Sequence, residues 1–282
     1  MLGKLIKHEW KSTYKVCGLI FICVALFTLL SCISLRMPSI YSAMTYRDGG
    51  AFGVLDAMGA LTFVLYVLTL LGASYGVIIY LGVHFYKSMY TDEGYLTHTL
   101  PVTVPQLFVS KILVGAVWML LVGAAIIVSV VGLLYTFMCM YMPGTPAEVT
   151  GVLAESFSQL FEELGSDIQA ELVHLTVSTV LTVVVGPFCS AAILFGSITL
   201  GQLFTRYRAL MAIVCYIVVN ILQSVLSFLI QIPLTIGYVM AGSDPVAYYA
   251  KTFDWSLVLS LITGVLLYFA SYMVLTRKFD IE

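Results

Sequence analysis

The pattern in this sequence with the clearest chemical potential is a row of uncharged polar side chains within a long apolar stretch. The row recurs at i, i+3, i+4, i+7 and i+11, which places its members on one face of an α-helix. Amide and hydroxyl groups in a membrane helix avoid lipid and face other helices or a water-filled cavity. Two interpretations follow, hydrogen bonding between packed helices or lining of a substrate path, and one upstream residue could join either. The row is Asn220, Gln223, Ser224, Ser227 and Gln231, and the upstream residue is Gln202.

Ionisable and nucleophilic residues form no catalytic pattern. Residues 8–12, HEWKS, begin like the HExxH motif of zinc proteases but lack its second histidine. The six cysteines lie within or beside apolar runs without CxxC spacing, as expected of small buried side chains. We therefore predict no enzymatic activity and no metal site. The histidines, all expected near membrane interfaces, are His8, His84, His98 and His174.

Two absences narrow the function classes. No lysine, arginine, aspartate or glutamate falls near the middle of an expected membrane span, although proton and sodium pumps usually need such a residue. The sequence also contains no GxxxxGK[ST] loop, so this chain is expected to bind no cofactor itself. If ATP and magnesium drive its activity, they bind to a separate subunit. No nucleic-acid partner is predicted.

The composition is that of an integral membrane protein. Of 282 residues, 61% are hydrophobic and 10% are charged, against roughly 25% charged residues in soluble domains. The apolar runs predict an all-α fold with six transmembrane helices in one domain, residues 1–282. Each run can cross ~30 Å of hydrocarbon. The expected spans are 16–35, 57–83, 112–141, 172–204, 210–232 and 256–276, with an aromatic, membrane-hugging loop at 233–254.

Two further helices are expected outside the spans. Residues 1–15 place lysines on one helical face and apolar residues on the other, which predicts a cytosolic interfacial helix on anionic lipid. Residues 145–165 form a second amphipathic helix, with a TPAE capping box at its start and Gly165 at its end. This acidic helix could gate an outer mouth, receive a cationic peptide or lie on the outer surface.

Charge distribution predicts the orientation. Six spans put both termini on one side, and cytoplasmic loops carry an excess of lysine and arginine. Ten of the 13 basic residues fall on the side of the termini, so both termini and the 84–111 loop are expected in the cytosol, with helix 145–165 outside. The ten are Lys4, Lys7, Lys11, Lys15, Lys87, Lys111, Arg206, Arg208, Arg277 and Lys278.

The cytosolic loop 84–111 has the composition of a small docking element. It places aromatic and methionine side chains beside charges, and such anchors supply contact area while charges set orientation. Pro101 and Pro105 stiffen its return to the membrane. The alternative interpretation is an interfacial loop whose tyrosines anchor it in lipid.

This loop resembles the permease subunits of bacterial type-2 ABC exporters, those of Gram-positive bacteria above all. The resemblance covers most of the chain in layout and about 30 positions in residues, within FYKSMYTDEGYLTHTLPVTVPQLFVSKIL, and the N-terminal LIKHEWK is also similar to these proteins. It implies a coupling helix that seats on a separate ABC ATPase, with two permeases and two ATPases in the working unit. The implied coupling residues are Phe85, Tyr86, Lys87, Met89, Tyr90, Asp92, Glu93, Gly94, Tyr95 and Leu96.

The expected function is therefore the membrane-spanning subunit of an ATP-driven exporter in the bacterial plasma membrane. It would pair with a second permease copy or a paralogue, and the polar row would line its translocation path. An amphiphilic substrate, such as an antimicrobial peptide, a lipid or a drug, is what the resemblance implies. The alternative is a non-transport immunity or sensor protein that binds a peptide at its acidic outer helix.

Overall fold

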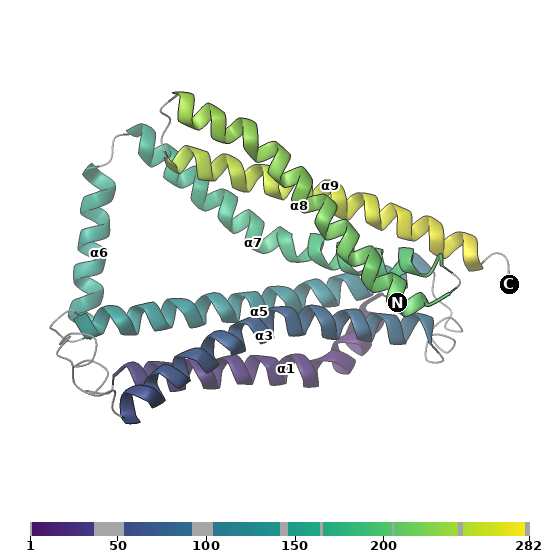
Figure 1. Ribbon diagram of the computed structural model, residues 1–282, viewed down its shortest axis with the longest axis horizontal. Coiled ribbons are helices and arrows are strands. Elements are labelled where there is room, and N and C mark those ends of the chain that lie inside the picture. Colours follow the sequence, from purple (N-terminus) through teal and green to yellow (C-terminus); the bar gives the residue numbers. More distant parts are fainter. Residues whose placement is uncertain are drawn as a thin grey trace. The chain divides into compact units, whose positions relative to one another are not determined.

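The computed structural model of the protein describes residues 2–36, 54–91, 104–141, 146–163, 166–204, 206–241 and 245–279, and that part of the chain is helical without strands. Figure 1 shows the helices in chain order, coloured from purple to yellow. They are α1 (Leu2–Leu35), α3 (Val54–Tyr90), α5 (Val104–Tyr141), α6 (Pro146–Glu163), α7 (Ser166–Gly201), α8 (Arg208–Ala241) and α9 (Pro245–Phe279).

Six of these helices have the length and composition of membrane spans. Within the described residues, α1, α3, α5, α7, α8 and α9 each contain 32 to 36 suitable residues, more than the ~20 needed to cross hydrocarbon. Large apolar side chains such as Leu19, Val128 and Leu222 are exposed along them. The prediction of an all-α, multi-pass membrane protein is confirmed at this level.

Several expected helix boundaries are wrong. Residues 1–15 do not form a separate interfacial helix, because α1 runs without a break from Leu2 to Leu35. The 85–90 turn is likewise the last part of α3 rather than an isolated short helix. No proline interrupts either segment, and the intervening polar residues are compatible with a helix.

The expected aromatic loop at 233–254 is also wrong. Helix α8 continues through Pro233 to Ala241, and α9 already begins at Pro245. Proline is tolerated inside membrane helices, since neighbouring groups can satisfy the backbone that it disrupts. Pro187 likewise lies inside the continuous helix α7. The amphipathic helix expected at 145–165 is present as α6, with Pro146 as its first residue.

The chain divides into two compact units, and α1, α3 and α5 contribute to both. Unit 1 contains Met1–Thr13, Ile78–Leu120 and Leu164–Glu282. Its core includes Phe85, whose ring stacks on Phe195 with centroids 4.4 Å apart and meets the edge of Phe108 at 5.9 Å. Helices α7, α8 and α9 pack on one another in this unit. Unit 1 holds every candidate site described below.

Unit 2 contains Tyr14–Val77 and Leu121–Glu163. Hydroxyl groups join its helices: Ser129 on α5 lies 2.6 Å from the Thr28 hydroxyl on α1 and 2.9 Å from the Tyr66 hydroxyl on α3. Thr62 on α3 also donates to Ser34 on α1 at 2.9 Å. Such contacts are the usual polar links between membrane helices.

Candidate functional site

A groove of about 530 Å³ lies among α7, α8 and α9 in unit 1. All five residues of the polar row on α8 line it, so the helical period read from the sequence places them together as expected. Hydroxyl groups of Ser190 on α7, and of Ser256 and Ser260 on α9, join them. The remaining lining residues are Ile193, Tyr216, Phe228 and Leu259.

Close helix packing sets the walls of this groove. On α7, a Cβ atom added to Gly196 would lie 2.9 Å from the Leu267 Cβ on α9. At the end of α7, a Cβ atom on Gly201 would lie 2.4 Å from the Ala212 Cα on α8. Glycine permits these approaches because it has no side chain, a common device between membrane helices. Both neighbours of α7 are thereby held close to it.

Part of the row is already hydrogen-bonded along its own helix. The Asn220 Nδ2 donates to the Tyr216 carbonyl at 2.8 Å, and the Ser224 hydroxyl donates to the Asn220 carbonyl at 2.8 Å. The Gln231 Nε2 lies 3.4 Å from the Ser227 hydroxyl, a long contact for a hydrogen bond. Among the described residues, the row thus makes hydrogen bonds along its own helix and none to another helix, and it lines the groove.

Gln202 does not join the row. It lies in the turn after α7, is 4% exposed, and its Nε2 is 3.3 Å from the Ile198 carbonyl. The residues that line the groove do not include Gln202, so the expectation that it contributes to the same surface is not met; the α7 residues in the lining are Ser190 and Ile193.

The predicted coupling segment is only partly on the surface. Phe85 and Met89 are 1% and 2% exposed, so they pack inside unit 1 and present no anchor in this structure. The Tyr90 hydroxyl donates to Thr199 at 3.0 Å. Tyr86 is half-buried and Lys87 is exposed. Asp92, Glu93, Gly94, Tyr95 and Leu96 lie outside the described residues.

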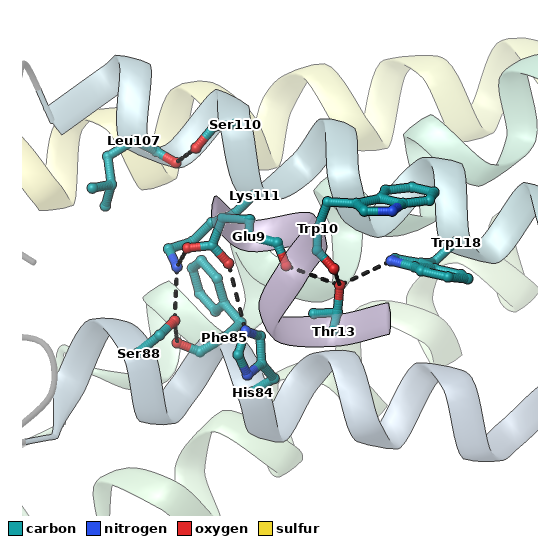
Figure 2. Close-up of polar contacts among 10 residues, drawn as sticks. All are labelled: Glu9, Trp10, Thr13, His84, Phe85, Ser88, Leu107, Ser110, Lys111 and Trp118. Carbon is teal, nitrogen blue, oxygen red and sulfur yellow. Dashed lines mark hydrogen bonds and ion pairs between the residues drawn. The ribbon is translucent and has the colours of Figure 1, made fainter. Parts of the chain in front are cut away.

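A buried charge cluster ties α1, α3 and α5 together in unit 1, as Figure 2 shows. The Lys111 Nζ lies 2.5 Å from Glu9 Oε1 and donates to the Ser88 hydroxyl at 2.8 Å. His84 Nε2 lies 3.5 Å from the other Glu9 oxygen. The Lys111 side chain is 3% exposed and that of Glu9 is 14% exposed, so each charge depends on the other for compensation.

An aromatic contact extends this cluster. The Trp118 indole donates to the Thr13 hydroxyl at 2.8 Å, and its ring stacks on Trp10 with centroids 4.4 Å apart (Figure 2). Sequence reasoning missed the cluster. The sequence feature that could have indicated the cluster is the position of Glu9. This carboxylate falls on the same helical face as Leu5 and Thr13, and on the side opposite to the lysines of residues 1–15.

A second polar contact joins α7 and α9. Asp254 accepts a hydrogen bond from Ser178 at 2.5 Å and lies 3.3 Å from His174 Nε2. The three residue types are those of a hydrolase triad, but here the serine and the histidine both contact the carboxylate. A triad requires the histidine between the other two. No group of three or more potential metal ligands occurs among the described residues.

No protein-family model, curated protein or solved structure matches the chain. The resemblance to type-2 permeases therefore rests on the sequence segments quoted above and stays a hypothesis.

Proposed function

We propose that this chain is the membrane-spanning subunit of an ATP-driven exporter, working with a separate ATPase and a second permease copy or paralogue. The observation that carries the proposal is the groove on α7, α8 and α9, which is lined by the polar row within otherwise apolar helices. Polar groups at this position are costly unless they face partners or water. A groove of about 530 Å³ also falls in the size range of small-molecule sites.

The absence of an ATP-binding loop from the sequence supports a two-subunit arrangement. ATP and magnesium would bind the partner, and closure of the ATPase would act on the cytosolic end of α3. Among the described residues of the coupling segment, the Lys87 side chain is exposed and that of Tyr86 is half-buried. Phe85 and Met89 would transmit the movement into unit 1, since they pack in its core.

Cysteine accessibility tests this proposal. Ser227→Cys is placed in a chain whose six native cysteines are replaced, and the protein is purified with its ATPase and reconstituted in lipid. A membrane-impermeant maleimide should label Ser227→Cys at rates that differ between the nucleotide-free and ATP-bound states. Leu222→Cys, on the exposed apolar face of α8, should stay unlabelled in both, because maleimides react with a hydrated thiolate.

Two results would contradict the proposal. The first is complete protection of Ser227→Cys in every nucleotide state. The second is an ATPase that remains bound after Tyr86→Ala and Lys87→Ala are combined with replacement of residues 92–96 by glycine and serine. The first result would show that the groove is not a hydrated path. The second would show that this segment does not couple the chain to the ATPase.

A further inference from the structure

The lining of the α7–α9 groove contains no side chain that is charged at neutral pH. It consists of three carboxamides, five serine hydroxyls, one tyrosine and three apolar residues. A charged ligand group would be desolvated there without a counter-charge, which is far more costly than burying a paired polar group. The groove therefore selects against ions and in favour of neutral groups that form hydrogen bonds.

Three of the polar groups remain available for a ligand. Gln223 on α8, Ser190 on α7 and Ser256 on α9 line the groove and make no hydrogen bond with any other described residue. Gln223 is half-buried and the two serines are exposed. The three groups come from three different helices, and convergent polar groups of this kind fix ligand orientation in otherwise apolar sites.

The donors and acceptors of these groups define the ligand chemistry. A glutamine carboxamide offers N–H donors and a carbonyl acceptor side by side, and each serine can do either. The matching group on a ligand both donates and accepts without carrying charge, as a carboxamide does. Ile193, Phe228 and Leu259 in the same lining supply contact for an apolar tail.

We propose that the groove binds an amphiphile through an uncharged carboxamide group, with Gln223 as the central hydrogen-bonding residue. This inference rests on the proposed transport function, of which it names the substrate class. Charged amphiphiles of the same chain length bind more weakly, because no residue of the lining compensates their charge.

The test uses Ser227→Cys in the full-length chain with the native cysteines replaced, reconstituted with its ATPase in phosphatidylcholine nanodiscs. The labelling rate by an impermeant maleimide is measured with decanamide, decanoate or decyltrimethylammonium at equal content in the membrane. Decanamide should slow labelling about tenfold, as two neutral hydrogen bonds allow. The two ions should change the rate by less than about twofold.

Substitutions at Gln223 sharpen the test. Gln223→Leu should abolish protection by decanamide, whereas Leu222→Ala, on the exposed face of the same helix, should preserve it. Gln223→Glu keeps the side-chain shape but adds a negative charge. Protection by decyltrimethylammonium should then appear, because the carboxylate attracts the quaternary ammonium electrostatically.

The two proposals fail in different ways. If Ser227→Cys is labelled but the ions protect it as well as decanamide, or decanamide protects the Gln223→Leu variant, the ligand chemistry is wrong and the hydrated path stands. If Ser227→Cys is unlabelled in every nucleotide state and forms a disulfide between two copies, the groove is an interface between protomers and both proposals are wrong.

Discussion

At the scale of single residues, Glu9 and Lys111 form a buried ion pair whose disruption should strongly affect stability. Burying an ion pair brings little net stability, because the loss of hydration offsets the attraction between the charges. Removing one partner is different, since it leaves an uncompensated charge in a poorly hydrated site. The Ser88 hydroxyl and His84 are the other polar groups beside the pair.

Lys111→Met should therefore lower the free energy of unfolding by about 3–5 kcal/mol. The double variant Glu9→Leu/Lys111→Met should recover most of this loss, because neither charge remains. Unfolding in mixed detergent micelles of increasing dodecyl sulfate content, followed by tryptophan fluorescence, measures both variants.

Lys15→Met is the matched control, since Lys15 is an exposed lysine of α1. It should change stability by no more than about 0.5 kcal/mol. A double variant as unstable as Lys111→Met alone would show that the two charges do not compensate each other.

At the scale of helices, the turn between α7 and α8 depends on a close backbone approach. Gly201→Ala places a Cβ atom 2.4 Å from the Ala212 Cα, and a backbone neighbour cannot rotate away. The variant should lose about 3 kcal/mol of stability or more. Gly237→Ala in α8, where a Cβ meets nothing within 4 Å, should be neutral or slightly stabilising.

Thermal unfolding of the two variants in the same detergent distinguishes these outcomes. Equal melting temperatures for Gly201→Ala and Gly237→Ala would mean that α7 and α8 are separated enough to accept a methyl group. Labelling of Ser227→Cys in the Gly201→Ala background adds a second measurement, since displacement of α8 should alter the groove.

The helices also show which features a single sequence can predict. The row on α8 was predictable because helical period is a local property, and α6 because proline begins it. The boundaries of α1, α3 and α8 were not predictable in this way. Polar residues and Pro233 indicate helix ends by local rules, but the helices continue through them in the folded protein. Gln202 lies beyond the last turn of α7, and the Glu9–Lys111 contact joins residues 102 positions apart, which no local pattern reveals.

At the scale of the whole molecule, the orientation in the membrane is a separate prediction. Ten of the 13 basic residues fall on the side expected to be cytosolic. In intact cells, an impermeant maleimide should label Glu155→Cys on α6, whereas Lys87→Cys on α3 should react only after permeabilisation. Both positions are exposed in the structure.

The cysteine-replaced background and Leu19→Cys provide the controls. Leu19 is 61% exposed on the apolar surface of α1, so a cysteine there should stay unlabelled on both sides of the membrane. Labelling of Lys87→Cys in intact cells would invert the orientation and place the proposed coupling segment outside the cytosol.

The sequence separation of Glu9 and Lys111 also has a consequence for biosynthesis. Glu9 emerges from the ribosome 102 residues before its counter-charge, an interval of roughly 5–20 s at ordinary synthesis rates. During that interval the start of α1 carries an unpaired carboxylate that favours water over lipid. The first helix therefore completes its packing against α3 and α5 only after α3 and the start of α5 have been made, 102 residues after Glu9 itself.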